Sequence, residues 1–172
     1  VIGSDVYAGG FFSQANSGNN VPANNIAKWN GSSWSALGSG GGNGVNNSVE
    51  ALSVNGTDLY VGGAFLQANV GAQISANRIA KWDGSNWSPL GLAGGNGFNA
   101  TVSALVWSGT DLYVGGSFAI ANVGANLTAN RVAKWNGSSW SALTQGGGNG
   151  TSGQVNALGA DSCHIYAGGT FA

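Results

Sequence analysis

The chain has 172 residues, of which 42% are hydrophobic and 10% aromatic, so it can bury a sizeable core and is not a disordered tail. A charged fraction of 6% and a formal net charge of −1, with no block of Lys or Arg, argue against a nucleic-acid partner, which requires a phosphate-neutralising surface. The single cysteine, Cys163, excludes an intrachain disulfide framework, and no apolar stretch reaches the length of a membrane span, so we expect no membrane insertion.

A repeat of 53 residues runs through the whole chain. The motif YAGG or YVGG begins at Tyr7, Tyr60, Tyr113 and Tyr166 without an insertion or deletion between copies. Self-similarity at this period is typical of propellers and stacked arrays. We therefore predict four units: repeat 1 at 1–48, which lacks most of its first strand, repeat 2 at 49–101, repeat 3 at 102–154, and the start of a fourth repeat at 155–172.

Within each repeat the pattern is all-β, because Gly, Asn and Ser interrupt every short apolar run and helical periodicity is missing. In chain order, the second repeat predicts antiparallel strands at 49–54, 59–62, 78–82 and 87–90. Residues 55–58 and 83–86 are predicted as tight hairpin turns, and residues 64–77 and 91–101 as long loops. Since alternate connections of a meander emerge at opposite ends, we expect a long-loop face, carrying the partner contacts, and a turn face.

The order of these features resembles the kelch family. The residues that carry the resemblance are LYVGG at 59–63, followed by RIAKWDGSNW at 78–87. They are similar to the Gly/Asn-rich repeats of secreted bacterial proteins and of the fungal cortical polarity-marker family. The resemblance implies β-propeller blades of four antiparallel strands, about three of them here, in a chain that continues as a larger propeller or an array. A β-trefoil is the alternative fold.

The recurring tryptophans predict packing between strands and between repeats. Trp82 and Trp87 flank a turn, so they lie on adjacent strands. The structural set is Trp29, Trp34, Trp82, Trp87, Trp135 and Trp140. Trp107 breaks the pattern, since Val54 and Ala160 hold its place in the neighbouring repeats, and it is the alternative candidate for a platform that binds sugar rings.

Polar residues in the long loops are the other candidates for binding. These asparagines are Asn16, Asn24, Asn69, Asn77, Asn122 and Asn130. The long loop holds no carboxylate, so a metal site is not expected, and the Gly-Gly pairs lack the helix and the Lys-Ser/Thr of a phosphate cradle. We expect no cofactor. With a lone His164 and no nucleophile–base–acid set, we also expect no enzymatic activity.

The chain is also rich in acceptor motifs for N-linked glycans, of the form Asn-x-Ser/Thr. They begin at Asn30, Asn46, Asn55, Asn86, Asn99, Asn126, Asn136 and Asn149. We interpret the sequence as a non-enzymatic extracellular or cell-surface repeat protein with a structural, adhesive or filament-forming role, whose partners are neighbouring repeats, further copies of itself or surface glycans. The alternative is a carbohydrate-binding, lectin-like propeller or β-trefoil.

Overall fold

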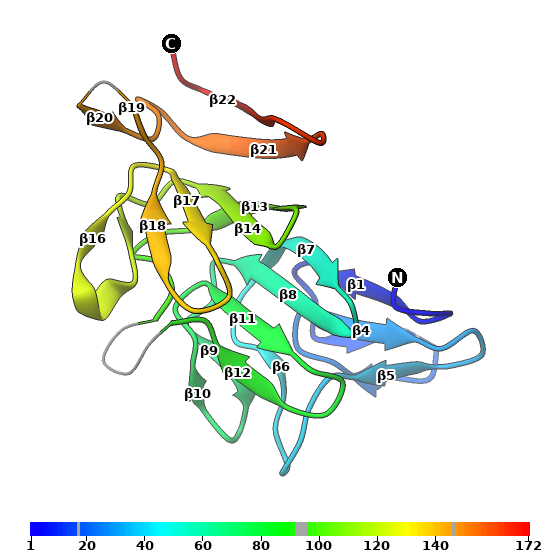
Figure 1. Ribbon diagram of the computed structural model, residues 1–172. Helices are drawn as coiled ribbons and strands as arrows, with labels where there is room; N and C mark the ends of the chain where they lie inside the picture. Colours follow the sequence, from blue (N-terminus) through cyan, green and yellow to red (C-terminus); the bar gives the residue numbers. More distant parts are fainter. Residues whose placement is uncertain (17, 92–95, 146) are drawn as a thin grey trace.

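The computed structural model describes residues 1–16, 18–91, 96–145 and 147–172, and it is an all-β protein (Figure 1). The first repeat holds β1 (Val6–Gly9), β2 (Gln14–Ala15), β3 (Val21–Pro22), β4 (Ile26–Trp29), β5 (Trp34–Ala36) and β6 (Asn43–Val45). The second holds β7 (Val49–Asn55), β8 (Asp58–Gly63), β9 (Gln67–Val70), β10 (Ile74–Ser75), β11 (Ile79–Trp82) and β12 (Trp87–Pro89).

The third repeat holds β13 (Val102–Ser108), β14 (Asp111–Gly116), β15 (Ile120–Ala121), β16 (Leu127–Thr128), β17 (Val132–Trp135), β18 (Trp140–Ala142), β19 (Thr144–Gln145) and β20 (Gly148–Asn149). The last residues form β21 (Val155–Ala160) and β22 (Ile165–Gly169). Among the described residues, the helical content is the short 3-10 turn η1 (Val123–Ala125), and no helix is long and apolar enough to cross a membrane.

Each repeat builds one antiparallel sheet, which we call its main sheet. The strand orders are β1-β4-β5, β12-β11-β8-β7, β13-β14-β17-β18 and β21-β22. The second and third main sheets are complete four-stranded meanders, and the four strands predicted for the second repeat are confirmed to within about a residue. Equivalent strands carry the same register and the same irregularity, a shift after Val49, Val102 and Val155.

Short polar turns close the hairpins at one end of each main sheet. In the second repeat Gly56 adopts a φ of 61° between the paired residues Asn55 and Asp58, a conformation that favours glycine. At the next turn the Asp83 carboxylate accepts hydrogen bonds from the backbone N–H groups of Ser85 and Asn86, at 2.9 and 2.7 Å. The side chain thus fixes the turn locally, as Asn and Asp commonly do.

The prediction that 64–77 is a long loop is wrong. This segment contains β9 and β10, and β9 pairs on its other edge with β6, which belongs to the preceding repeat. Phe65, Ala68 and Ala76 within it are fully buried. The segment is therefore part of the core and cannot be replaced by a flexible link.

The second expected loop, 91–101, is described in part, because residues 92–95 lie outside the described residues. Within it, Phe98 is fully buried and forms an isolated β-bridge with Ala121.

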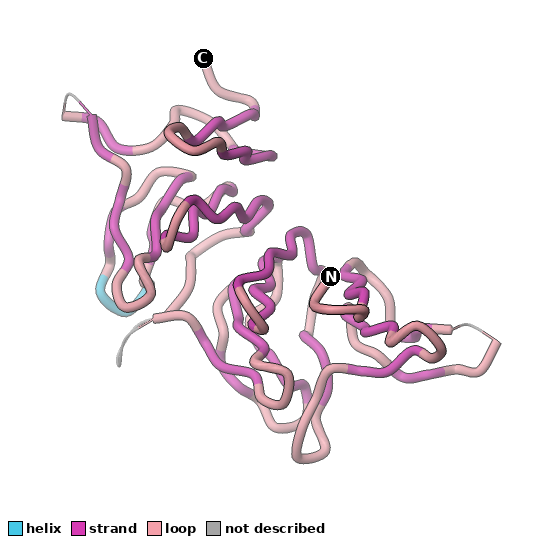
Figure 2. The backbone as a smooth tube through the Cα atoms, turned by 45° about the vertical axis from the view of Figure 1, so that its right-hand side comes forward, coloured by secondary structure: helices cyan, strands magenta, loops and turns pink. Residues whose placement is uncertain are grey.

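The main sheets follow one another as separate layers, from β1, β4 and β5 to β21 and β22 (Figures 1 and 2). The first strands of the last three repeats, β7, β13 and β21, follow one another in space, with β13 in contact with both of the others. The first and last layers lie apart in both views, so the described residues form an open row of sheets and no closed propeller. The two core clusters lie between layers, one between repeats 1 and 2 and one between repeats 2 and 3.

Candidate functional site

The feature that the structure repeats most faithfully is the interface between successive repeats, which we take as the candidate functional site. Its first element is a glycine facing a valine. A Cβ built on Gly62 would lie 2.5 Å from Cγ1 of Val102 in the next repeat, and one built on Gly115 would lie 2.5 Å from Cγ1 of Val155. Gly9 has the same relation to Val49, at 2.4 Å. The absence of a side chain lets the sheets approach.

The second glycine of each pair serves the sheet to which it belongs. A Cβ on Gly63 would lie 2.1 Å from the carbonyl oxygen of Ser48, which precedes the first strand of the same repeat. Gly116 and Gly169 have equivalent contacts with their own first strands. Close approach of strands within one sheet therefore explains the second glycine. The first glycine has a different task, contact with the next repeat.

The tryptophan pairs form the second element of the interface. The Trp87 indole donates from Nε1 to the carbonyl oxygen of Leu37, 3.1 Å away in the preceding repeat, and Trp140 donates in the same way to Leu90 at 3.4 Å. Their ring partners Trp82 and Trp135 lie at centroid distances of 5.4 and 5.1 Å. All four of these rings are buried. Each pair therefore fastens its repeat to the one before it.

The first tryptophan pair has the same internal geometry but different surroundings. Trp29 and Trp34 have ring centroids 5.6 Å apart, and both side chains are half-buried. They lie on the outer layer of the described structure, with no preceding repeat against them. The difference in burial shows that stacking of repeats, and not the hairpin alone, buries these rings.

The asparagines singled out in the sequence lie at two kinds of place. Asn69 is 3% exposed, and it bridges to the preceding repeat by accepting from the backbone N–H of Ser39 at 3.1 Å and donating to its carbonyl oxygen at 2.8 Å. Asn16, its equivalent in the first repeat, is exposed. Asn122, the third member, adopts the same left-handed backbone conformation and precedes η1.

The other three candidate asparagines connect the segment between the second and third strands of a main sheet to the segment that follows its fourth strand. Asn24 contacts Asn43, Asn77 contacts Asn96 and Asn130 contacts Asn149, through hydrogen bonds of 2.6 to 3.3 Å. The structure brings each pair together within its own repeat and does not gather the six candidates into one cluster. Their amides are used to hold backbone in place, which is the ordinary role of Asn in turn-rich segments.

Two of the glycan acceptor motifs have a structural role that the sequence did not reveal. The Asn46 side-chain oxygen accepts from the backbone N–H groups of Leu66 and Gln67 at 2.9 and 3.0 Å. Asn99 does the same for Ala119 and Ile120, at 2.9 and 3.0 Å. Asn46 and Asn99 occupy equivalent positions of successive repeats, and this recurrence was the feature of the sequence that could have indicated their role. By contrast, Asn30, Asn55, Asn86 and Asn136 lie on exposed turns at the opposite end of the sheets.

The lysine of each repeat is paired with an aspartate of the same repeat. The Lys81 ammonium lies 2.9 Å from the Asp58 carboxylate, and the pairs Lys28–Asp5 and Lys134–Asp111 repeat this contact at 3.1 and 2.8 Å. The hydrogen bond to Asp58 raises the pKa of Lys81 above its usual value of 10.5. Burial, countered by the nearby Lys81 charge, raises the pKa of the Tyr60 phenol above 10.0.

The fourth repeat departs from this pattern. His164 stands where the other repeats have aspartate, and its Nδ1 lies 3.3 Å from a carboxylate oxygen of Asp161. Backbone hydrogen bonds from Cys163 and His164 and one from the Tyr166 hydroxyl hold the pKa of Asp161 at about 2. Asp161, Cys163 and His164 lie on an exposed turn, and Tyr166 is exposed on β22. No group of three or more metal-ligating side chains occurs among the described residues.

Trp107, the alternative sugar platform, lies at an interface. Its ring stands edge-on to Tyr60 of the preceding repeat with centroids 5.0 Å apart, and the side chain is half-buried. The indole Nε1 is buried and has no hydrogen-bond partner among the described residues. Since the neighbouring repeats have Val54 and Ala160 at this position, the aromatic contact occurs between repeats 2 and 3 and has no equivalent at the neighbouring interfaces.

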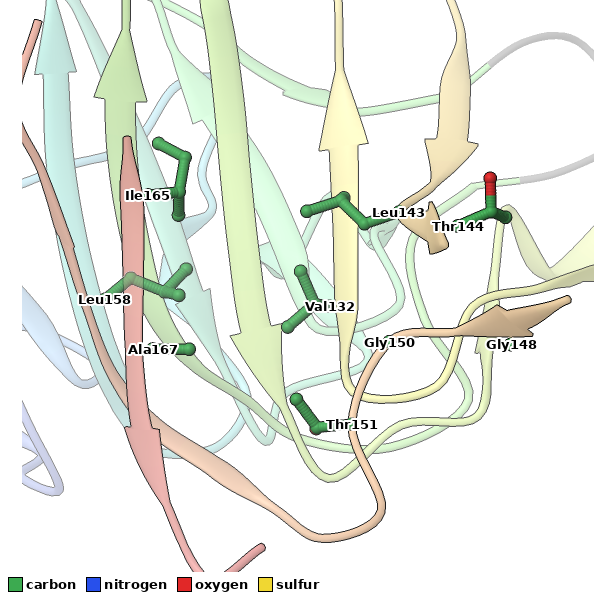
Figure 3. A pocket seen from close by; sticks show the side chains of 9 residues that line it. All are labelled: Val132, Leu143, Thr144, Gly148, Gly150, Thr151, Leu158, Ile165 and Ala167. Carbon is green, nitrogen blue, oxygen red and sulfur yellow. The ribbon is translucent and has the colours of Figure 1, made fainter. Parts of the chain in front are cut away.

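Cavities occur at both ends of the row of sheets. One of about 640 Å³ is lined by Val132, Leu143 and Leu158 among others, between the third main sheet and the β21–β22 pair (Figure 3). A second, of about 380 Å³, lies on the first repeat and is lined by Phe12, Asn16 and Trp34 among others. Between repeats 1 and 2 and between repeats 2 and 3, the corresponding space is filled by the two core clusters.

The fold and this interface define a class: an all-β protein whose antiparallel sheets stack through one recurring glycine, valine and tryptophan contact. Comparison with known proteins adds nothing to this class, because no family model and no curated protein matches the chain.

Proposed function

We propose that the chain is a non-enzymatic structural module of an extracellular or cell-surface protein, built from kelch-like blades that stack into a larger propeller or an extended, adhesive or filament-forming array. The observation that carries this proposal is the recurrence of one interface at successive steps of the row, with Gly62 against Val102 and Gly115 against Val155. Arrays in which each unit contacts its neighbours gain stability with every added unit.

The use of the polar side chains supports a structural role over a catalytic one. In each complete repeat the lysine of the third strand is paired with an aspartate, as Lys81 is with Asp58. The amides of Asn69 and Asn77 hold backbone or other amides. An active site instead needs titratable groups that face a substrate space with their reactive atoms available.

Each main sheet takes its strands from a single repeat, which supports stacked blades over a β-trefoil. The extracellular location draws its support from the acceptor motifs on the turn face, where Asn30 and Asn136 are exposed. Both residues use the side-chain oxygen to close their own turn, at 2.9 and 2.8 Å from the N–H groups of Ser33 and Ser139.

Insertion of one extra repeat tests the structural proposal. A second copy of residues 49–101, placed between residues 101 and 102, continues the glycine, valine and tryptophan contacts without a change of register. We expect the enlarged chain to unfold cooperatively at a melting temperature equal to or above that of the original chain, measured by circular dichroism. A shuffled copy of the same 53 residues is the control. Loss of the cooperative transition in the first variant would refute the stacking role.

A carbohydrate-binding role is the second candidate, and one cavity favours it. The space on the first repeat combines the Trp34 ring with the Asn16 amide, and sugar-binding sites join aromatic faces to amide hydrogen bonds in this way. Titration of oligosaccharides against the tryptophan fluorescence tests it. A saturable change that is lost in Trp34→Ala and kept in Trp29→Ala would establish the lectin role, and no change with any sugar would remove it.

A further inference from the structure

The large cavity at the end of the row has a filled equivalent one repeat earlier. Figure 3 shows Leu158, Ile165 and Ala167 on one side of it, and Val132 and Leu143 on the other. Counting back 53 residues, the equivalent side chains are Leu105, Leu112, Val114, Ile79 and Leu90. Those side chains belong to one core cluster together with Ala133 and Trp140, which lie on the third and fourth strands of their repeat.

The cavity is therefore the space that a third and a fourth strand would occupy. A hairpin that fits it carries a small residue and a tryptophan in the positions of Ala133 and Trp140, and its tryptophan can donate to the carbonyl oxygen of Leu143, as Trp140 does to Leu90.

The first repeat presents such a hairpin on an open face. Strands β4 and β5 carry Ala27 and Trp34, which line the cavity of about 380 Å³ together with Ala8 and Phe12. In the second repeat the equivalents of these four residues are Ala80, Trp87, Val61 and Phe65, and all of them are buried in the core shared with repeat 1. The two ends of the row thus carry the two complementary halves of one interface.

The strands at the two ends of the chain occupy the same position within the repeat. Residues 160–172 are equivalent to residues 1–13, so β22 is the equivalent of β1. Strand β1 is held in its main sheet by β4 alone, through four register pairs, whereas β22 is paired with β21 through five. A second copy seated on the cavity would bring β1 to the place that β22 already occupies.

We propose that two copies of this chain associate head to tail by strand exchange, in which β22 of one copy replaces β1 against β4 of the next. The product is a four-stranded sheet in the order β21-β22-β4-β5, equivalent to the main sheets of repeats 2 and 3. The inference rests on the stacking of repeats proposed above and extends it from one chain to two.

The register of the exchanged sheet follows from the complete ones. Gly62 pairs with Ile79 in the second main sheet, so Gly168 takes Ile26 of the second copy as its partner. Gly168 also completes the glycine–valine contact: a Cβ built on it meets nothing within 4 Å now, and in the assembly it faces Val49 of the second copy.

Exchange changes the balance of contacts in favour of association. The four backbone pairs between β1 and β4 are replaced by those between β22 and β4. The Trp34 ring gains a neighbouring sheet, and the apolar wall around Leu158 and Ile165 is covered. One loss is the packing of the half-buried Ile2 against the core shared with repeat 2, since Asp161 takes its place. The other is the ion pair between Asp5 and Lys28, whose side chains are 27% and 34% exposed, a setting in which ion pairs contribute little.

Head-to-tail contacts use two different surfaces, so they can continue beyond a dimer or close into a ring. The exposed edge of β1, on which Val6 is 42% exposed, leaves the sheet in each exchange. This distinguishes the exchange from a simple contact between folded copies, in which β1 stays paired.

Gly168→Val in the full chain tests the proposal, with Gly159→Val as the matched control. A Cβ built on either glycine meets nothing within 4 Å in the single copy. The equivalent of Gly159 is Val106, so a valine is compatible with stacking there. Equilibrium sedimentation should show concentration-dependent association of the original chain and of Gly159→Val, and at least a tenfold weaker association of Gly168→Val.

Hydrogen exchange on the original chain gives the second measurement. As the concentration rises, the backbone amides of β1 should lose protection while those of β4 keep it. A chain that stays monomeric, equal association of both valine variants, or protection of β1 in the assembled form would each overturn the proposal. Because the repeat insertion tests stacking within one chain and the glycine variants test it between chains, either idea can fail alone.

Discussion

The glycine–valine contact makes a quantitative prediction about Gly62→Ala. The new Cβ would lie 2.5 Å from Cγ1 and 3.2 Å from Cβ of Val102, which is fully buried. Overpacking of this kind destabilises by about 1–3 kcal/mol. The matched reference is Gly168→Ala, where the added methyl meets nothing within 4 Å. Both variants restrict the unfolded chain equally, so their difference isolates the clash.

We therefore expect Gly62→Ala to be about 1–3 kcal/mol less stable than Gly168→Ala in urea unfolding at one low protein concentration. In a protein of this size that corresponds to a difference of roughly 2–12 °C in melting temperature. Val102→Ala should partly relieve the clash, so the double variant should lose less stability than the sum of the two single variants. Equal stability of Gly62→Ala and Gly168→Ala, or strict additivity with Val102→Ala, would refute the contact.

Three further predictions concern polar groups. Asn69→Ala should lose about 1–3 kcal/mol in urea unfolding because a buried bridge is removed, and should lose more than Asn16→Ala, which changes the exposed equivalent in the same backbone conformation. Since the pKa of Lys81 is raised in the folded chain, its stabilising effect is complete below pH 10.5 and is lost as the pH rises above it; the melting temperature should fall in that range, and less so in Asp58→Asn. Asn46→Asp keeps the acceptor oxygen and should melt like the original chain, whereas Asn46→Ala should melt lower.

The strands of the main sheets follow from the sequence because each is an apolar run bounded by turn residues. Residues 49–54 and 59–62 alternate in this way around a Gly-containing turn, and the structure has β7 and β8 there. The tryptophan pairs were predictable for the same reason, since they flank a turn of fixed length and must lie on neighbouring strands.

The short hairpins outside the main sheets, such as β9–β10, were not predictable in this way. Strands β9 and β10 consist of four and two residues, and β9 carries Ala and Asn, which are poor indicators of strand. Their stabilisation comes from pairing with β6 of the preceding repeat and from burial of Phe65, neither of which a local pattern records. The valine that faces each glycine was equally hidden, although its spacing of 53 residues from the next valine was visible.

One residue at the end of the row connects the stacking within a chain to association between chains. Thr151 lines the large cavity at the place held by Phe98 one repeat earlier, and Phe98 is fully buried with its ring 4.7 Å from that of Trp140. The exchanged interface therefore lacks an aromatic pair that the interface between repeats 2 and 3 has, and such a pair is worth about 0.5–1.5 kcal/mol.

Association between copies should accordingly be weaker than the stacking of repeat 3 on repeat 2. Thr151→Phe should strengthen it by roughly 2- to 12-fold, the same free energy expressed as an equilibrium constant. The hydroxyl lost in this variant donates to the carbonyl oxygen of Gly153 at 2.8 Å, so Thr151→Val serves as the control that removes the bond without adding a ring. Sedimentation equilibrium of the three chains measures the effect. If Thr151→Phe associates no more tightly than Thr151→Val, the cavity does not receive the tryptophan of a second copy, because a ring placed on its wall would then have nothing to meet.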